Sequence, residues 1–328
     1  MRIVIAGVGA MGCLLGACLS PLADVTLFGH WPEQVATLRR RGLWLEHLDG
    51  TRRHYHLSVA DDAAAVGAAD VALVAVKSRQ TRQTARTLAG LLDGNGLALT
   101  LQNGLNNRAT LRDALGNDRV CLGVTSEGAT VLEPGVVRHA GHGLTHVGRD
   151  PSLGRPQLAC LPALTALFNA AGFETYLVDN TDGLVWGKLA VNAAINPLSA
   201  LLRVPNGFLV EHGALIVLMG RAANEVASVA AARSITLPFN DAAGRALDVA
   251  RATAANRSSM LQDVLRGAPT EIDAICGAVE RVGRESGVPT PVNSRLYELV
   301  RQLEEGRAAI TPGDVAGLIA LMETATAR

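Results

Sequence analysis

The sequence predicts an α/β protein with two domains: an N-terminal Rossmann-type domain built on a mostly parallel sheet, and a C-terminal all-α domain. Short β-branched apolar runs alternate with helix-like segments in the first half of the chain, which is typical of βαβ units. A glycine-rich turn follows the first apolar run. After about Asp179 the strand pattern stops, and segments rich in Ala, Leu, Glu and Arg continue to Thr324. Such a change of pattern indicates a domain boundary.

The strands predicted for the first domain are apolar at successive positions, which indicates burial on both faces. They are Arg2–Ala6, Val25–Phe28, Val71–Val76 and Leu97–Leu101, with helices expected at Ala10–Leu19, Glu33–Arg41 and Thr81–Leu92. We expect Val120–Thr125, Val136–Val137 and Leu144–Gly148 to extend that sheet at one edge, followed by a helix at Leu158–Ala171 and a last strand at Glu174–Val178. The sequence thus predicts a dinucleotide-binding domain over residues 1–179 and a helical substrate domain over residues 180–328.

Composition excludes several classes of function. The chain has 328 residues, 48% of them hydrophobic, and equal numbers of acidic and basic residues. A nucleic-acid-binding protein would show a surplus of basic residues, which is absent here. A membrane-spanning helix would need about 20 consecutive apolar residues, and we expect no such helix in this sequence. The five cysteines are scattered, as in a reducing compartment. These features predict a cytoplasmic protein with a small-molecule partner, and a homodimer would be an ordinary assembly for it.

A glycine-rich loop follows the first strand and begins the first helix. Its pattern is G-x-G-x-x-G, in which the first glycine makes a tight turn, the second lets a pyrophosphate approach the backbone, and the third lets helix and strand pack closely. The N–H groups at the start of the helix then face the phosphates. The residues expected to bind a dinucleotide are Gly7, Val8, Gly9, Ala10, Met11 and Gly12.

The end of the second strand bears on the choice between NAD and NADP. An acidic residue there would bind the ribose 2′-hydroxyl of NAD. The sequence has Phe28-Gly29-His30 instead, and Asp24 comes too early. We therefore expect NADP(H), with His30 or an arginine of the run 39–41 beside the 2′-phosphate; alternatively, that run is a solvated helix face.

The second domain contains a polar stripe on an otherwise apolar helix. Lys188, Asn192 and Asn196 are four residues apart, so they lie on one face. Unless this face is exposed to water, these groups need partners, because burying them unpaired is costly. Two short amides beside one lysine suggest a site for a small polar ligand.

Three further features bear on function. Asn103-Gly104 follows a strand, at the sheet edge where ligands bind in α/β folds. Thr270 is expected to cap a helix with Glu271 in its first turn. His139, His142 and His146 fall in a predicted hairpin without a Cys or HExxH pattern, so no metal site is predicted.

Together these motifs resemble those of the ketopantoate reductase (2-dehydropantoate 2-reductase) family over almost the whole chain. The landmarks are the glycine loop, Lys77-Ser78-Arg79-Gln80, Gln102-Asn103-Gly104, the strand at 143–148, W-x-K-L-x-x-N-x-x-x-N-P-L from Trp186, Pro205-Asn206-Gly207, S-S-M-L-Q-D-V at 258–264, T-E-I-D at 270–273, and Gly287-Val288-Pro289-Thr290-Pro291. The resemblance implies NADPH-dependent reduction of ketopantoate to pantoate, for pantothenate and coenzyme A. It also implies a helical domain like that of 6-phosphogluconate dehydrogenase.

The resemblance also implies roles for individual residues. Lys188 would be the general acid that protonates the ketone oxygen. The cofactor would contact Lys77, Asn103, Ala129 and Glu271, and the substrate would be held by Asn103, Asn192, Asn196, Asn206 and Ser259. Hydride addition builds negative charge on the ketone oxygen, so a cation that can release a proton suits that position.

The chain departs from the family at two places. Gly29-His30 stands where the family commonly has an arginine for the 2′-phosphate, and Asn106-Asn107-Arg108 replaces a glycine and acidic residues. Two other functions fit the sequence: a reductase of a different 2-oxo acid, and a dinucleotide sensor without turnover. An intact Lys188 argues against the sensor, which has no need of a proton donor.

Overall fold

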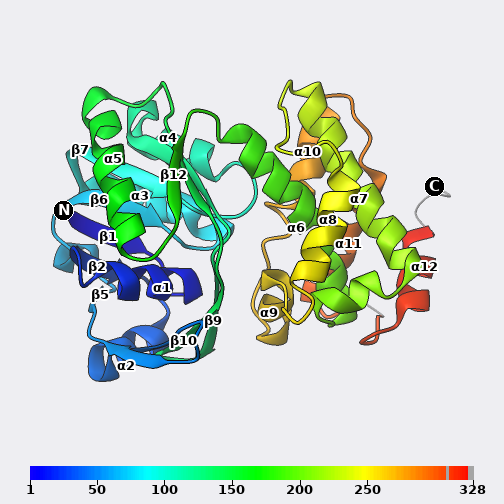
Figure 1. Ribbon diagram of the computed structural model, residues 1–328, viewed down its shortest axis with the longest axis horizontal. Coiled ribbons are helices and arrows are strands. Elements are labelled where there is room, and N and C mark those ends of the chain that lie inside the picture. Colours follow the sequence, from blue (N-terminus) through cyan, green and yellow to red (C-terminus); the bar gives the residue numbers. More distant parts are fainter. Residues whose placement is uncertain (308–309, 324–328) are drawn as a thin grey trace. The chain divides into compact units, whose positions relative to one another are not determined.

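The computed structural model describes residues 1–307 and 310–323 and divides into two compact units (Figure 1). Unit 1 comprises Met1–Gln102 and Asn107–Thr181, and unit 2 comprises Asn103–Asn106 and Asp182–Arg328. The short segment Asn103–Asn106 therefore belongs with the helical unit, although it follows a strand of the sheet. Thr324, at which these segments were expected to end, lies outside the described residues.

Unit 1 is built on a mostly parallel sheet, as the sequence predicts. In the described residues its order is β12 (Thr175–Val178), β11 (Thr145–Gly148), β8 (Val120–Thr125), β7 (Leu92–Thr100), β6 (Ala69–Val74), β1 (Arg2–Ala6), β2 (Asp24–Phe28) and β5 (Ser58–Ala60). Neighbouring strands run parallel from β5 to β8, β11 pairs with β8 antiparallel, and β12 pairs with β11 parallel.

Helices cover both faces of this sheet, and alternate residues of β1 show why. Ile3 and Ile5 belong to one hydrophobic cluster, which also takes in α1 (Ala10–Leu19) and α5 (Arg155–Ala170). Val4 and Ala6 belong to another, with α3 (Thr81–Leu91) and α4 (Asn107–Leu115). Side chains of a strand point to alternate faces, so a strand covered on both sides must be apolar throughout.

A second, four-stranded sheet was not expected from the sequence. Its order is β4 (Arg52–Tyr55), β3 (Leu43–Glu46), β10 (Val136–Gly141) and β9 (Gly128–Glu133). The expectation that Val136–Val137 extends the main sheet is therefore wrong: these residues pair with β3 and β9. The helix α2 (Pro32–Arg41) precedes β3.

Unit 2 is all-α in its described residues (Figure 1). Its helices are α6 (Asp182–Leu202), α7 (Gly213–Ala232), α8 (Ala242–Ala252), α9 (Ser259–Leu265), α10 (Cys276–Glu285), α11 (Pro291–Glu304) and α12 (Val315–Glu323). One hydrophobic core joins α6, α7, α8 and α11. The helix α7 is long and apolar enough to cross a membrane, contrary to expectation, but Leu215, Met219 and Val226 are buried in this core. Its apolar character is therefore accounted for by helix packing.

One predicted helix start is wrong. Thr270 does not cap a helix: its hydroxyl accepts a hydrogen bond from the Ile272 N–H at 3.2 Å, and residues 271–275 form turns. The helix α10 begins only at Cys276. Glu271 consequently precedes the helix and is buried in a turn, where its carboxylate can meet residues of other segments.

Candidate functional site

The glycine loop of unit 1 has the geometry that its sequence predicts. Gly7 has a φ of +131°, and a Cβ on Gly12 would lie 1.9 Å from the Gly7 carbonyl oxygen, so neither position accepts a side chain. A Cβ on Gly9 would meet nothing within 4 Å. Gly9 is also the N-cap of α1 and has no side chain to bond the first N–H groups. The loop therefore leaves an open cradle of backbone donors that suits a pyrophosphate.

His30 is exposed just beyond β2, and a carboxylate lies at the same edge of the sheet. Asp61 directly follows β5, whose Ala60 pairs with Phe28 of β2. Arg39 of α2 donates to both carboxylate oxygens of Asp61, at 3.2 and 2.5 Å. This pairing lowers the pKa of Asp61, and the nearby His30 contributes to the shift. The arginine considered for the 2′-phosphate is thus held by an acid that the sequence did not reveal.

Two further residues of unit 1, Lys77 and Ala129, are expected to contact the cofactor, and they are associated with different sheets. Lys77 follows β6 and precedes the short 3₁₀ helix Ser78–Gln80, whereas Ala129 lies on β9 of the second sheet. Gln102, at the end of β7, donates to the Val76 carbonyl and the Thr81 hydroxyl, each at 2.8 Å. The carboxyl ends of β6 and β7 are thereby held together, beside the glycine loop that follows β1.

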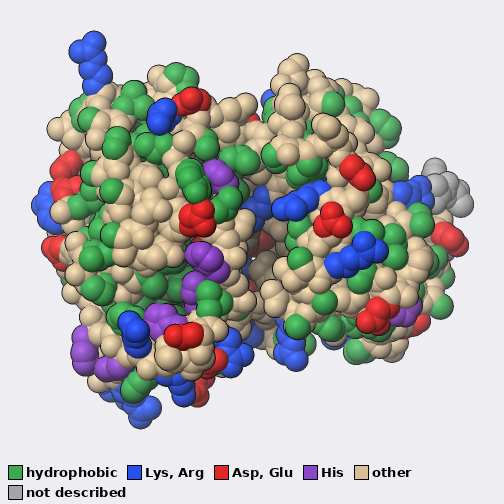
Figure 2. Space-filling view, in the orientation of Figure 1, with side chains coloured by type: hydrophobic (Ala, Val, Ile, Leu, Met, Phe, Trp, Pro, Cys, Tyr) green, Lys and Arg blue, Asp and Glu red, His purple; other side chains and the backbone are tan. Residues whose placement is uncertain are grey.

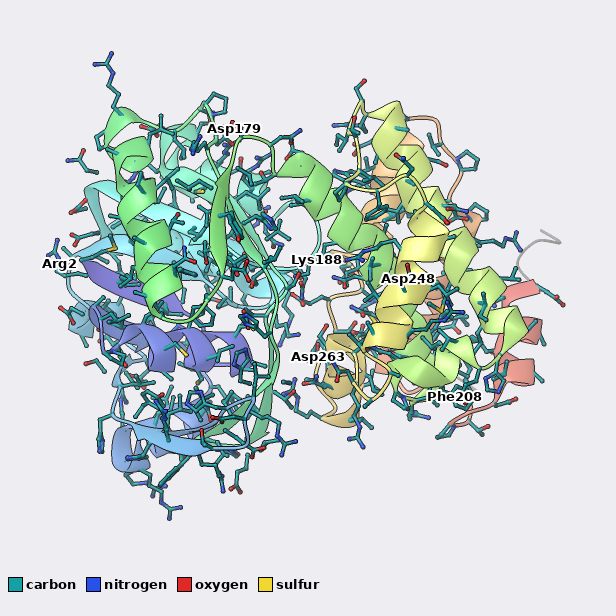
Figure 3. All side chains as sticks on the ribbon, in the orientation of Figure 1. Arg2, Asp179, Lys188, Phe208, Asp248 and Asp263 are labelled. Atoms are coloured by element: carbon teal, nitrogen blue, oxygen red, sulfur yellow. The ribbon has the colours of Figure 1, made fainter. Side chains whose placement is uncertain are left out.

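In unit 2 the predicted polar stripe lies on α6, and Figure 3 labels its lysine, Lys188. Lys188 and Asn192 are partly buried, and Asn196 is 6% exposed. Among the described residues, neither amide side chain has a hydrogen-bond partner. Because burying unpaired amides is costly, their presence here points to a polar ligand.

The pKa of the Lys188 ammonium group is changed by its surroundings. Burial lowers its pKa to about 8, and the negative charge of Glu271 partly opposes this shift. Asn103 donates to the Glu271 carboxylate at 3.4 Å. Three residues far apart in the sequence are thus brought together within unit 2, and the lysine has a pKa near neutral pH, where an amine can both carry and release a proton.

Asn103 reaches this position because of the glycine that follows it. Gly104 has a φ of +79°, and a Cβ there would lie 2.3 Å from the Ala274 carbonyl oxygen. The next N–H, of Leu105, donates to that carbonyl at 3.0 Å. The backbone thus packs directly on the turn that carries Glu271, which explains the Asn-Gly pair in physical terms.

Two neighbouring serines have different surroundings. Ser258 caps α9, accepts a bond from the Leu261 N–H at 3.0 Å, and lies 2.5 Å from the Ser199 hydroxyl of α6. The Ser259 hydroxyl has no hydrogen-bond partner in the described part of the chain. The capping role falls on Ser258, so Ser259 is available to a ligand beside the stripe on α6.

Asn206 is held rigidly, with one atom unsatisfied. Its backbone N–H donates to the Asn256 carbonyl at 3.0 Å, and its side-chain nitrogen donates to the Thr253 hydroxyl at 2.9 Å. The Oδ1 atom is buried and lacks a partner among the described residues. A buried acceptor of this kind suits a ligand hydroxyl.

The structure accounts for the second departure from the family pattern. Asn106 has a φ of +71°, a conformation that glycine adopts most easily and asparagine tolerates. Asn107 accepts a bond from the Thr81 hydroxyl at 3.0 Å, and Arg108 pairs with Asp150 at 3.2 Å. Asn107 and Arg108 therefore bond within unit 1.

The three histidines considered for a metal do not stay together. His146 lies on β11 with its ring centroid 6.2 Å from that of Tyr176. His139 and His142 instead meet Glu127, at 2.5 and 2.9 Å. Sequence spacing gave no sign of Glu127, or of Asp61 beside His30, because each joins its partners only through the pairing of strands.

Comparisons with known proteins agree along both units. A family model described as ketopantoate reductase PanE/ApbA matches residues 3–152, and one described as its C terminal part matches residues 180–304. A 2-dehydropantoate 2-reductase of Halobacterium salinarum is 40% identical over 302 residues, which cover 92% of this chain and 98% of the relative. That of Archaeoglobus fulgidus is 34% identical over 312 residues, covering 93% and 98%.

Two solved structures are also similar. A PanE/ApbA family ketopantoate reductase from Ralstonia eutropha JMP134 is 33% identical with a TM-score of 0.84, over 94% of this chain and 99% of that one. A D-mandelate dehydrogenase with NADH and anilino(oxo)acetate is 26% identical with a TM-score of 0.87, over the same two shares.

Proposed function

The chain belongs to the ketopantoate reductase family, and we propose that it reduces 2-dehydropantoate (ketopantoate) to pantoate with NADPH, in the cytoplasm, as a step in making pantothenate and coenzyme A. The observation that carries this proposal is Lys188, whose pKa burial lowers to about 8. It lies on the same helix as two amide side chains that have no hydrogen-bond partner among the residues that the structure describes. A group that can both stabilise and protonate an oxyanion is what ketone reduction needs.

The residues fit a nicotinamide dinucleotide. The open position at Gly9 and the uncapped start of α1 suit its pyrophosphate, and Lys77, Asn103, Ala129 and Glu271 are the further contacts we propose. When bound, the cofactor supplies the hydride for the ketone carbon. Lys188 gives a proton to the ketone oxygen, so that the carbonyl, the hydride and this proton together give the alcohol.

The proposed substrate matches the polar groups of unit 2. Ketopantoate carries a carboxylate, a ketone, a 4-hydroxyl and two methyl groups. Asn192 and Asn196 offer donors for the first two. The 4-hydroxyl can donate to the unsatisfied Oδ1 of Asn206 and accept from the Ser259 hydroxyl. The apolar neighbours on α6 suit the methyl groups.

A second function rests on a specific similarity. The D-mandelate dehydrogenase structure contains NADH and anilino(oxo)acetate, so a closely similar fold serves a different 2-oxo acid and the other cofactor. A reductase of another 2-oxo acid, such as an aromatic one, is therefore the alternative.

One assay separates the two functions. Purified protein is mixed with NADPH or NADH and either ketopantoate or phenylglyoxylate, and oxidation of the cofactor is followed by absorbance. We expect the highest kcat/KM for ketopantoate with NADPH. Turnover of phenylglyoxylate at a higher kcat/KM would favour the alternative, and no turnover of any 2-oxo acid would contradict both.

A further inference from the structure

One carboxylate of unit 1 is buried among histidines. Glu127 follows β8, and its side chain is 1% exposed. Its Oε2 lies 2.5 Å from Nε2 of His139, and its Oε1 lies 2.9 Å from Nδ1 of His142. Within the described residues its ion-pair partners are these two histidines, which carry charge only when protonated. A buried carboxylate without a permanent cation is costly, so this cluster requires an explanation.

The cluster has the composition and size of a metal site. One carboxylate and two imidazoles are common ligands of Zn²⁺, and their potential ligand atoms all lie within 4.8 Å of one another. In a tetrahedral zinc site with bonds of about 2.0–2.1 Å, neighbouring ligand atoms are about 3.3 Å apart. To admit the ion, the two contacts of Glu127 would need to lengthen toward this spacing, and ligand atoms as far apart as 4.8 Å would need to approach one another.

The ligands are held by separate parts of the fold. The Glu127 N–H donates to the Thr125 hydroxyl at 3.1 Å, and that hydroxyl lies 2.8 Å from the hydroxyl of Thr145. His139 belongs to β10, whereas His142 lies in the connection between β10 and β11. Fixed ligands from three segments lower the cost of arranging a site, and the 45% exposed side chain of His142 leaves a path for the ion.

We propose that Glu127, His139 and His142 form a zinc-binding site that ties the β8–β9 turn to the β10–β11 connection. This differs from the sequence-based expectation of no metal, because Glu127 takes the place that His146 could not fill. The ion is structural, with a water in its fourth position, and hydride transfer does not depend on it. Its positive charge neutralises the buried carboxylate of Glu127.

The experiment is a zinc titration of the full chain after removal of metals by a chelator, with metal content measured by mass spectrometry. We expect one zinc per chain and a higher melting temperature with zinc. Mg²⁺ at the same concentration should not compete, because it prefers oxygen ligands. Absence of zinc binding by the wild-type protein, or displacement by Mg²⁺, would overturn the proposal.

Variants locate the ion. His142→Ala alters a half-exposed side chain and should leave the metal-free fold intact, while Glu127→Gln removes the buried charge. Each should weaken zinc binding by at least about 10²-fold, since even outer partners of metal ligands contribute 10- to 100-fold. Melting temperatures without zinc identify any variant that fails to fold, and His142→Ala then carries the test.

Other histidines of unit 1 provide matched controls, since Figure 2 shows several histidines on the face of this unit that is in view. His54 and His56 have ring centroids 4.6 Å apart, so they are a second pair of histidines at which zinc could bind adventitiously. His146 is the histidine that the sequence places near His139 and His142 but that is not among the proposed ligands. The double variant His54→Ala/His56→Ala and the variant His146→Ala should bind zinc like the wild type. If either control lost zinc as strongly as His142→Ala, the proposed ligand set would be wrong.

Discussion

The glycine loop of unit 1 and the polar stripe of unit 2 differ in what gives each its chemistry. In the loop the functional groups are backbone N–H groups, and the sequence contributes the absence of side chains at Gly7, Gly9 and Gly12. In the stripe the functional groups are side chains, and their properties depend on neighbours such as Glu271, 83 positions away from Lys188 along the chain. The first kind of site is local, whereas the second exists only once unit 2 has folded.

This difference implies that the two sites can be impaired independently. Changes in the loop should affect cofactor binding with little effect on proton transfer, and changes in the stripe should do the reverse. The predictions below test that separation, beginning with the largest expected effect.

Replacing the proposed acid should abolish most of the turnover. Lys188→Ala should lower kcat by about 10²–10⁴, the usual contribution of a positioned acid, because the developing oxyanion loses both its cation and its proton donor. NADPH affinity, measured by fluorescence titration, should change little. Lys188→Arg should not restore turnover, because a guanidinium keeps its proton. Near-wild-type kcat in Lys188→Ala would show that another group is the acid.

Substrate selection should depend on the 4-hydroxyl. A site that bonds a hydroxyl rejects the analogue that lacks it, so kcat/KM for ketopantoate should exceed that for 2-oxoisovalerate by at least about 10²-fold. Ser259→Ala should reduce this ratio without lowering the melting temperature. Its neighbour supplies the control: Ser258→Ala removes the cap of α9 and should cost about 1 kcal/mol of unfolding free energy. Equal kcat/KM for the two acids would point to another 2-oxo acid as substrate.

Two glycines of the loop should respond differently to the same change. A Cβ at Gly9 meets nothing within 4 Å, so Gly9→Ala should keep its melting temperature but weaken NADPH binding by about tenfold or more, or about 1.4 kcal/mol. A Cβ at Gly12 would lie 1.9 Å from a carbonyl oxygen, so Gly12→Ala should also destabilise the fold, by about 1–3 kcal/mol. Binding and stability are measured by titration and thermal unfolding. Unchanged NADPH affinity in Gly9→Ala would contradict the proposed phosphate cradle.

The elements that the sequence predicts correctly depend, like the glycine loop, on residues that are close together in the sequence. The buried strand β1, most of β2 and β6 and the last part of β7 are mainly apolar, and α6 carries its polar stripe at a regular spacing of four. β4 was missed because its sequence, Arg-Arg-His-Tyr, is polar and mostly exposed, so no hydrophobic pattern marks it. Its pairing with β3 is a tertiary effect.

The sequence predicts individual site residues less completely, for the same reason. It indicated Lys188 and the two asparagines of α6, because one helix carries all three. It could not show that Asn103 packs with unit 2, since this depends on the close approach of Gly104 to Ala274. It also placed Glu271 in a helical turn, because Thr-Glu resembles a helix start although tertiary packing delays α10 to Cys276.

The pH profile should report the environment of Lys188. Its pKa lies at about 8, and the acid acts in its protonated form, so kcat for ketone reduction should fall as pH rises through about 8. Glu271→Gln removes the negative charge that raises this pKa, so the midpoint should move to lower pH. Steady-state kinetics at saturating cofactor measures both. A midpoint that moved upward would contradict the coupling between the two residues.

The smallest effects should appear in cofactor preference, where a few exposed charges act at the end of β2. We expect NADPH to be preferred modestly over NADH, because β2 does not end in a carboxylate that would bind the ribose 2′-hydroxyl of NAD. His30→Ala should reduce this preference, because it removes the proposed partner of the 2′-phosphate. Steady-state kcat/KM for the two cofactors gives the ratio for each variant.

Asp61 sharpens this last test, because it holds Arg39 in a two-bond pair beside His30. Asp61→Asn removes a charge that would repel a 2′-phosphate and releases the guanidinium. The preference for NADPH should therefore rise by a small factor, because exposed charges interact weakly in water. Arg39→Ala leaves the carboxylate unpaired and should shift the preference the other way. If the wild-type protein clearly preferred NADH, Asp61 rather than His30 would be the residue that selects the cofactor.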